Sequence, residues 1–376
     1  MNANKKTLNL VCPRNRKANA MSYYVNEFIK KTNRVFPAQG RYDYDRFDMN
    51  ENPEGLPQWF VDSVVREITP EFLATYPEPD RFQKKYAAFI GVPEDAVLAT
   101  NGSDMGIRYL LEVFGERGKS VVTVSPSFEM YRINCSILGL RHVPVEYEPD
   151  WTLRMDKLLH AIDSETRIVV LLNPNNPIGR PYTQLEITSV VARAREVGAV
   201  VIIDEAYHYF YPNTFLDDAL TCDHVVILRT FSKLFSLAAC RLGVMIGSPS
   251  LLRYVRNAKL TFDVNSVALL FGERVLEHPD MIDQLIQTEQ EGKQFITDAL
   301  TARGYVCRAG QGNFIFVKPC HDAQTLAARL ANEKKVLVHP YTNSLLRDYI
   351  RVSTGSKKAM ERFLDAFLDV DAEDAL

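Results

Sequence analysis

The sequence predicts an α/β fold in which a mostly parallel sheet lies between layers of helices, accompanied by a smaller α+β domain. From about residue 96 onward, short β-branched runs end in turn residues and alternate with longer stretches of helical period, as in βαβ units. Several runs are continuously apolar, as expected for strands buried on both faces of a parallel sheet. The predicted strands are Val97–Thr100, Val121–Val124, Ile168–Leu172, Val200–Asp204, Val225–Arg229 and Gly243–Gly247.

The pattern changes near Pro249, where long amphipathic stretches such as Met281 to Leu300 replace the alternation. We therefore expect an N-terminal arm with part of the small domain in residues 1–45, a large domain in residues 46–250 and a small C-terminal domain in residues 251–376. The expected strands of the small domain are Asn313–Val317, Val336–Val338 and Tyr349–Val352, and a helix around Ser250–Asp263 is expected to join the two domains.

The composition excludes several classes of protein. Hydrophobic residues make up 46% and charged residues 24% of the 376 residues, as in folded domains. No apolar run approaches the roughly 18 residues of a membrane span, and no signal peptide is indicated, so we expect a cytoplasmic protein without a membrane partner. The six cysteines lack CxxC pairs and the seven histidines form no cluster, which argues against a metal. The net charge of −3 gives no general attraction to nucleic acid.

Charge is uneven at the N-terminus, where the first 41 residues hold nine Lys or Arg and one acid, Glu27. The interpretation that we favour is a solvated arm. The alternative is an arm that folds over an anionic substrate.

Chemistry-bearing residues follow three of the predicted strands. Asn176 lies in the segment 173–179, Asp204 begins the segment 204–207, and Lys233 ends the segment 230–233. Because the carboxyl ends of parallel strands meet at one edge of a sheet, these segments are expected to converge on a ligand crevice. Taken singly, an aspartate there is more often a turn residue and a lysine more often a surface charge. The combination favours a functional site.

The residue types in these segments suit a cofactor with a pyridine ring and an aldehyde. Asp204 can keep a pyridine nitrogen protonated, which makes the ring an electron sink. Lys233 can form a Schiff base with the aldehyde and later carry a proton. Asn176 and Tyr207 are expected to donate hydrogen bonds to the phenolic oxygen of the ring, and Phe128 to stack on the ring face.

A phosphate on the cofactor needs hydrogen-bond donors and a positive charge. The segment after the first strand of the sheet can open a helix, and helix N-termini favour anions. Arg241, eight residues after the candidate lysine, supplies the charge. The remaining candidates for this phosphate site are Gly102, Ser103, Asp104, Ser232 and Thr230.

With these motifs, the chain resembles the fold-type I pyridoxal-phosphate enzymes, and among them the class I/II aminotransferases of the histidinol-phosphate aminotransferase-like branch. The resemblance runs from about Asn50 to Ser353 and implies an aspartate aminotransferase-like fold with pyridoxal 5′-phosphate as cofactor. The matching motifs are NENP at 50–53, TYPE at 75–78, NGSD at 101–104, PSFEMY at 126–131, NPNNPIG at 173–179, DEAY at 204–207, RTFSK at 229–233, LAACR at 237–241 and RVS at 351–353.

The resemblance assigns further roles. Tyr76 is expected to reach the cofactor phosphate of a neighbouring subunit, which implies a homodimer. Arg351 is expected to grip the α-carboxylate of an amino acid, and Asn52 in the NENP element is a further candidate for substrate binding. The alternative for Arg351 is an ordinary salt bridge.

The chain also departs from the branch. Enzymes specific for histidinol phosphate generally carry a second arginine about thirteen residues before the closing one, and here that position is Val338. Ile178 and Cys240 replace the usual Thr and Leu. If a substrate carries phosphate, the missing arginine could be replaced by Arg14, Arg16, Lys17 or residues around His339.

Three functions are therefore open, with amino-acid biosynthesis as the expected context. The first is transfer of an amino group between an amino acid, or an amino-alcohol phosphate, and a keto acceptor. The second is decarboxylation of a phosphorylated amino acid, which uses the same electron sink. The third is a binding or regulatory protein that keeps the fold without turnover.

Overall fold

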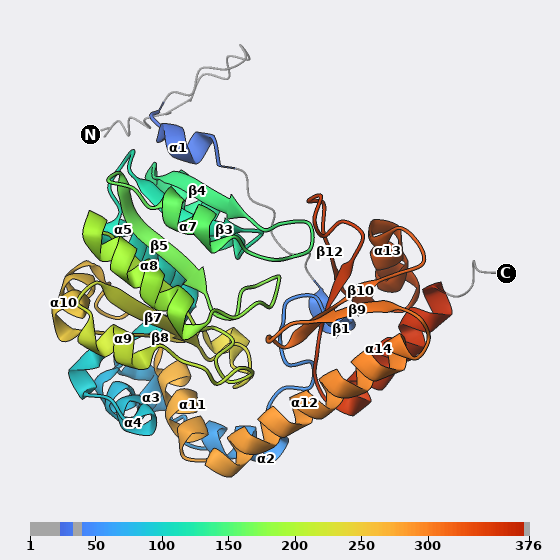
Figure 1. The fold of residues 1–376 in the computed structure, drawn as a ribbon. Coiled ribbons are helices and arrows are strands. Elements are labelled where there is room, and N and C mark those ends of the chain that lie inside the picture. Colours follow the sequence, from blue (N-terminus) through green and yellow to red (C-terminus); the bar gives the residue numbers. More distant parts are fainter. Residues whose placement is uncertain (1–22, 33–39, 372–376) are drawn as a thin grey trace, which may run out of the picture.

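The computed structural model describes residues 23–32 and 40–371. The arm residues Arg14, Arg16 and Lys17 lie outside these ranges. Two sheets of different size organise the described chain, and a long helix, α12 (Pro279–Thr301), leads from the larger sheet to the smaller one (Figure 1).

The larger sheet has seven strands in the order β2-β8-β7-β6-β5-β3-β4. Only β8 runs antiparallel to its neighbours, β2 and β7, while the other pairs are parallel. The mostly parallel α/β sheet is therefore confirmed. The strands are β2 (Val97–Asn101), β3 (Ser120–Ser125), β4 (Arg141–Glu146), β5 (Thr166–Leu172), β6 (Val200–Asp204), β7 (Val225–Thr230) and β8 (Leu242–Gly247).

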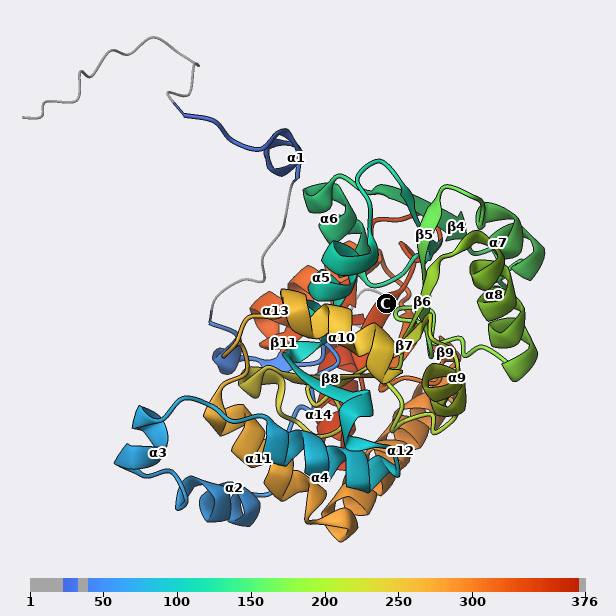
Figure 2. The same cartoon turned by 90° about the vertical axis from the view of Figure 1, so that its left-hand side faces the viewer.

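Helices cover both faces of this sheet and give three layers (Figure 2). On one face α5 (Gly102–Phe114) contacts β2, β7 and β8, with α6 (Glu129–Leu138) and α10 (Pro249–Ala258) packed beside it. On the other face lie α7 (Met155–Ala161), α8 (Gln184–Val197) and α9 (Leu216–Thr221). Burial on both faces explains the continuous apolar runs of the central strands.

Strand β4 is missing from the sequence-based prediction. It lies at the edge of the sheet, carries Pro144 and exposes several of its residues. An edge strand needs neither a continuous apolar run nor a backbone donor at every position, so its sequence lacks the signal of a buried strand.

The smaller sheet has four antiparallel strands in the order β12-β13-β10-β9. The predicted strand Val336–Val338 is divided in the structure, because β11 (Val336–Leu337) pairs with β1 (Asp45–Arg46) whereas β12 (His339–Pro340) joins the small sheet. The other strands are β9 (Val306–Ala309), β10 (Phe314–Lys318) and β13 (Ile350–Ser353), and the helices packed on this sheet are α12 (Pro279–Thr301), α13 (Ala323–Glu333) and α14 (Lys357–Asp371).

Helices from the segments before β2 and after β8 also pack with the larger sheet. Helices α10, which begins at Pro249, and α11 (Ser266–Leu276) contact β8 and therefore pack with the seven-stranded sheet. The boundaries of the two domains stay a prediction. The remaining helices are α1 (Glu27–Lys30), α2 (Gln58–Val65), α3 (Pro70–Ala74) and α4 (Asp80–Ile90), with one-turn helices η1 (Arg41–Asp43), η2 (Glu94–Ala96) and η3 (Ala238–Cys240).

A contact between two glycines joins the two sheets near the predicted site. Gly179 ends the NPNNPIG segment, and Gly310 lies in the turn between β9 and β10. A Cβ built on Gly179 would lie 2.6 Å from Cα of Gly310, and the carbonyl of Gly179 accepts a hydrogen bond of 2.8 Å from the amide of Gln311. Only glycine permits so close an approach of two backbones.

No helix in residues 23–32 and 40–371 is both long and apolar enough to cross a membrane.

Gly292 gives a stability test. A Cβ at this position in α12 would lie 1.9 Å from the carbonyl oxygen of Gly355, which is backbone and cannot rotate away. Although Gly to Ala usually favours a helix by about 1 kcal/mol, we expect Gly292→Ala to lower the free energy of unfolding by about 1–3 kcal/mol in a denaturant titration. The matched control is Gly106→Ala in α5, where the new methyl would meet the ends of the Leu228 and Met245 side chains. A Gly292→Ala protein as stable as the parent would contradict the packing described.

Candidate active site

The predicted site residues converge at one edge of the seven-stranded sheet. Asn176 and Lys233 follow the carboxyl ends of β5 and β7, and Asp204 is the last residue of β6. Because β8 runs in the opposite direction, Arg241 immediately before it returns to the same edge. The topology therefore explains how residues from positions 173 to 241 meet.

Asp204 is buried, with 3% of its surface exposed. Its carboxylate accepts hydrogen bonds from the hydroxyl of Tyr131 at 2.8 Å and the amide of Ala206 at 3.1 Å. Burial raises the pKa of Asp204 to about 6, against the lowering effect of these bonds. Neither donor is charged, so a protonated ring nitrogen is the kind of partner that this carboxylate lacks.

Tyr131 was not predicted as a site residue. It lies three residues after Phe128 in α6, so both side chains lie on one face of the first helical turn. This spacing is the signal in the sequence that points to it. Phe128 is half-buried at the start of the helix and lines a cleft with Tyr131, Ser125 and Ser127.

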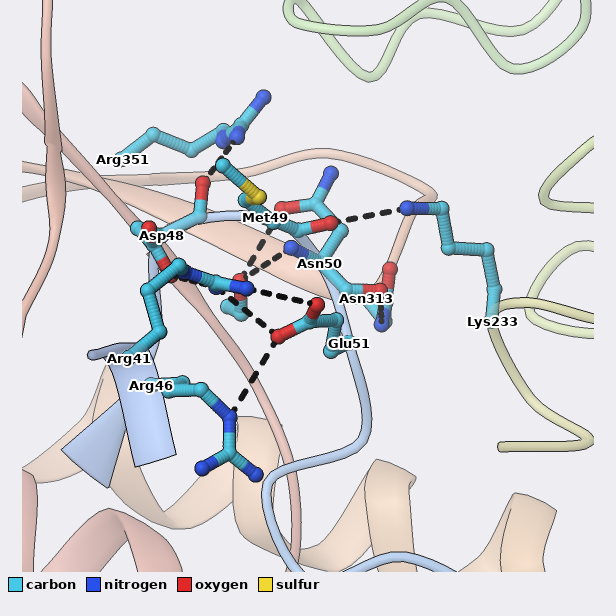
Figure 3. Close-up of polar contacts among 10 residues, drawn as sticks. Arg41, Arg46, Asp48, Met49, Asn50, Glu51, Lys233, Asn313 and Arg351 are labelled. Atoms are coloured by element: carbon cyan, nitrogen blue, oxygen red, sulfur yellow. Dashed lines mark hydrogen bonds and ion pairs between the residues drawn. The ribbon is translucent and has the colours of Figure 1, made fainter. Parts of the chain in front are cut away.

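The amine of Lys233 donates a hydrogen bond of 2.8 Å to the backbone carbonyl of Met49 (Figure 3). Burial lowers the pKa of Lys233 to about 8, and the positive charge of Arg351 adds to the effect. A lysine in this environment exists largely as the neutral amine at mildly alkaline pH. It is therefore suited to act as a nucleophile and as a proton carrier.

Asn176 and Tyr207 keep the donors that their predicted roles require. The hydroxyl of Tyr207 accepts a hydrogen bond of 2.9 Å from the side chain of Asn50, which leaves its own hydrogen available. Asn176 uses its carbonyl oxygen to accept from Arg351 at 2.8 Å, so its amide nitrogen remains the donor. Asn50 is a further residue of the site that was not predicted individually.

The predicted phosphate site fits an anion. Gly102 begins α5 with a φ of +72°, and a Cβ there would lie 2.6 Å from Nη2 of Arg241. Glycine thus lets the guanidinium lie against the helix N-terminus, which itself favours negative charge. Arg241 also contacts Ser232 at 3.4 Å and Asp104 at 3.2 Å, and Thr230 donates to Ser232 at 3.1 Å. Ser103 follows Gly102 in the same first turn.

Arg351 is buried in β13, with 7% of its surface exposed. Two of its five N–H donors are used by protein acceptors, the side chain of Asn176 and the carbonyl of Asp48 at 2.6 Å. Its Nε finds no partner among the residues that the structure describes. Three donors therefore remain for the two oxygens of a carboxylate, and no acidic partner forms the alternative salt bridge within residues 23–32 and 40–371.

Two predicted residues lie apart from this cluster. Asn52 donates to Ser236 at 2.8 Å and to the carbonyl of Gly55 at 3.1 Å, and it lines a cavity that reaches Lys233. Tyr76 is 73% exposed and stacks on Phe262, with ring centroids 4.4 Å apart. Its contact with a cofactor requires a second copy of the chain and stays a prediction.

A family model for class I and II aminotransferases matches residues 47–367. The chain belongs to this family. The predicted enzyme class, fold and pyridoxal-phosphate dependence are thereby confirmed.

Relatives and solved structures agree with the family. The chain is 31% identical over 358 residues to a histidinol-phosphate aminotransferase of Desulfitobacterium hafniense, covering 90% of this aminotransferase and 95% of the relative. It is 29% identical over 329 residues to that of Clostridium novyi, with coverages of 86% and 91%. The structure of the Sinorhizobium meliloti histidinol-phosphate aminotransferase in complex with pyridoxal-5′-phosphate matches with a TM-score of 0.84 at 21% identity, covering 94% and 98% of the two chains. These matches give no support to the decarboxylase or the non-catalytic alternative.

The pKa of Lys233 predicts a pH dependence in the aminotransferase freed of cofactor. Because the pKa is lowered to about 8, the neutral amine should appear at a lower pH than that of an ordinary lysine. Reductive methylation with formaldehyde, followed residue by residue in a mass spectrometer, should show Lys233 reacting with a midpoint near pH 8. An exposed lysine such as Lys84 serves as the internal control, and equal midpoints for the two would contradict the assignment.

Tyr131→Phe tests the environment of Asp204. The change removes a hydrogen bond that stabilises the ionised carboxylate, so the pKa of Asp204 should rise and its pairing with a ring nitrogen should weaken. A hydrogen bond to a charged group contributes about 1.5–3 kcal/mol, so we expect cofactor affinity to fall about tenfold or more in a spectroscopic titration. Tyr182→Phe is the control, because Tyr182 is equally buried but its hydroxyl makes no hydrogen bond to Asp204. Unchanged affinity in Tyr131→Phe would rule out this role.

Proposed function

We propose that this aminotransferase moves an amino group between an amino acid, or an amino-alcohol phosphate, and a keto acceptor, with Lys233 as the group that carries the proton. The observation that carries the proposal is the half-buried amine of Lys233, whose pKa is lowered to about 8, in a site where Asp204 of the large sheet and Arg351 of the small sheet lie buried. A general base with a pKa near the working pH transfers protons efficiently.

The residues that would hold pyridoxal 5′-phosphate divide into three groups. Asp204, supported by Tyr131, would pair with the ring nitrogen, and Phe128 would cover the ring face. Asn176 and Tyr207 would donate to the ring oxygen. The phosphate would lie at the start of α5, contacted by Gly102, Ser103, Asp104, Thr230, Ser232 and Arg241. When bound, the cofactor supplies an aldehyde that accepts the amino group and a ring that accepts electrons.

The protein then contributes orientation and proton transfer. Arg351 would hold the carboxylate of the donor with its remaining N–H groups, which fixes the Cα–H bond relative to the amine of Lys233. Lys233 would take the proton from Cα and return it to the cofactor carbon, and the same residues would serve the keto acceptor in reverse. Catalysis by alternating half-reactions follows from one site serving both substrates.

The site restricts the amino donor more closely than membership of the family does. The restriction follows from residue 338 and not from the names of the relatives. The position expected to hold a phosphate-binding arginine is Val338, whose side chain is buried and apolar. Of the two donor classes, we therefore favour the amino acid, whose carboxylate Arg351 can hold, over the amino-alcohol phosphate, which has no carboxylate. Asn52 would contribute to substrate binding from the neighbouring cavity.

Three further predictions belong to this proposal. Tyr76 would complete the phosphate site of a second copy, which makes the active form a homodimer, and its exposed, ring-stacked position supports this role. The division into an arm, a large domain at 46–250 and a small domain at 251–376 is kept as a proposal. A cytoplasmic location also remains a proposal.

A panel of amino acids with single-turnover bleaching of the visible cofactor band tests the function. Donors should bleach the band without keto acid, and addition of a keto acid should restore it, because the amino group alternates between cofactor and acceptor. Lys233→Ala should lose the band of the lysine-linked cofactor and reduce turnover by about a thousandfold or more, since proton transfer by a positioned group accounts for roughly 10²–10⁴-fold. Release of CO2 with no need for a keto acid would contradict the proposal.

A further inference from the structure

The loop Asp48–Glu51 contacts both reactive cations of the site through two consecutive backbone carbonyls. The carbonyl of Asp48 accepts from Nη2 of Arg351 at 2.6 Å, and that of Met49 accepts from the amine of Lys233 at 2.8 Å. Figure 3 shows the loop between the two side chains. The position of this loop therefore affects the orientation of the Lys233 amine and of the Arg351 guanidinium.

Asn50 fixes the middle of the loop from the other side. Its amide donates to the hydroxyl of Ser353 at 2.7 Å, its side chain donates to Tyr207 at 2.9 Å, and its carbonyl accepts from Asn313 at 3.1 Å. Asn50 adopts a φ of 55°, so the backbone turns sharply there. This turn directs the carbonyls of the two preceding residues toward the cations.

The loop also carries two carboxylates, on Asp48 and Glu51, next to the site that must receive a substrate carboxylate. Burial alone would raise the pKa of Glu51, but hydrogen bonding and charge from Arg41, helped by Arg46, bring the pKa below its ordinary value. Glu51 is thus ionised at neutral pH. The charge of Glu51 acts to raise the pKa of Lys233. A carboxylate freed from its partner would favour the protonated form of Lys233 further and would compete with the substrate for Arg351.

Arg41 contacts both of these carboxylates. Its Nη1 and Nη2 donate to the two oxygens of Glu51 at 3.0 Å each, and Nη2 also donates to Asp48 at 2.6 Å. All three side chains are mostly buried, with exposed fractions of 19%, 14% and 24% for Arg41, Asp48 and Glu51. A two-point contact in such surroundings fixes geometry as well as charge. Arg46 adds a longer contact of 3.6 Å to Glu51.

We propose that Arg41 is a positioning residue for amino transfer: it holds the carboxylates of Asp48 and Glu51 away from Arg351 and Lys233, so that Arg351 remains available to the carboxylate of the substrate. Arg41 touches neither cation and acts through the loop. This inference rests on the proposed function, because it assigns the substrate carboxylate to Arg351. The alternative is that Arg41 acts as a simple structural brace, which means that its ion pairs only stabilise the fold. The positioning role and this alternative predict different effects when the carboxylates of Asp48 and Glu51 are made neutral.

The test compares Arg41→Ala with a charge-relieved variant, Arg41→Gln/Asp48→Asn/Glu51→Gln. Arg41→Ala leaves two unpaired carboxylates near the site, so the KM of the best donor in the panel should rise on the order of tenfold or more, while kcat changes much less. The charge-relieved variant should restore KM to within about threefold of the parent, because neutral amides cannot compete for Arg351. If Arg41 is only a brace, the charge-relieved variant should have the higher KM of the two, since it loses more ion pairs than Arg41→Ala.

A second readout does not depend on turnover. Propionate, a carboxylate without an amino group, is titrated into the cofactor-loaded protein and followed by its effect on the visible spectrum. Its dissociation constant should rise about tenfold in Arg41→Ala and return in the charge-relieved variant. If Arg41→Ala does not fold, the charge-relieved variant alone decides: parent-like affinity supports the proposal, and weakened affinity overturns it.

Arg362→Ala is the matched control. Arg362 pairs with Asp45 at 3.3 Å and with Glu54 at 3.8 Å, on either side of the same loop, without contacting Asp48 or Glu51. It should leave KM and propionate binding unchanged, and an effect equal to that of Arg41→Ala would overturn the proposal. Absence of amino transfer by the parent protein would count against the proposed function, whereas normal parent activity with an unchanged Arg41→Ala would count against Arg41 alone.

Discussion

Desolvation of charged groups at one edge of the seven-stranded sheet is the constraint on which this molecule depends. Asp204 and Arg351 are buried and Lys233 is half-buried, without ion pairs to one another, and burial raises the pKa of Asp204 and lowers that of Lys233. Such an arrangement costs stability unless a ligand or fixed dipoles compensate it. The hydroxyl of Tyr131 and the carbonyls of the loop Asp48–Glu51 supply neutral partners, so each charge remains available for chemistry.

The direction of the strands makes this arrangement possible. Parallel strands deliver side chains from distant positions to one edge, and the single reversed strand, β8, brings Arg241 back to it. The small sheet contributes Arg351 through β13 and Asn313 just before β10. Both sheets are thus needed to complete one site.

The sequence predicted the central strands, because burial on both faces leaves a continuous apolar run, and it predicted Lys233, Asp204 and Arg241 as candidates through their order after those strands. It did not reveal β4, where an edge position removes the apolar signal, or the separate pairing of Val336–Leu337. Tyr131, Asn50 and Arg41 were also missed. Their roles arise from contacts between segments far apart in the chain, or from a backbone carbonyl, which leaves no mark on residue type.

The glycine contact between Gly179 and Gly310 has a consequence for how the two sheets are held together. It joins the two halves of the site through bare backbone and one hydrogen bond from Gln311, beside the contact between Asn176 and Arg351. Aromatic pairs lie across the same boundary, with ring centroids 5.0 Å apart for Trp151 and Phe316 and 5.6 Å apart for Tyr207 and Phe314. The glycine contact and these ring pairs therefore hold the small sheet, and with it Arg351, against the residues of the large sheet.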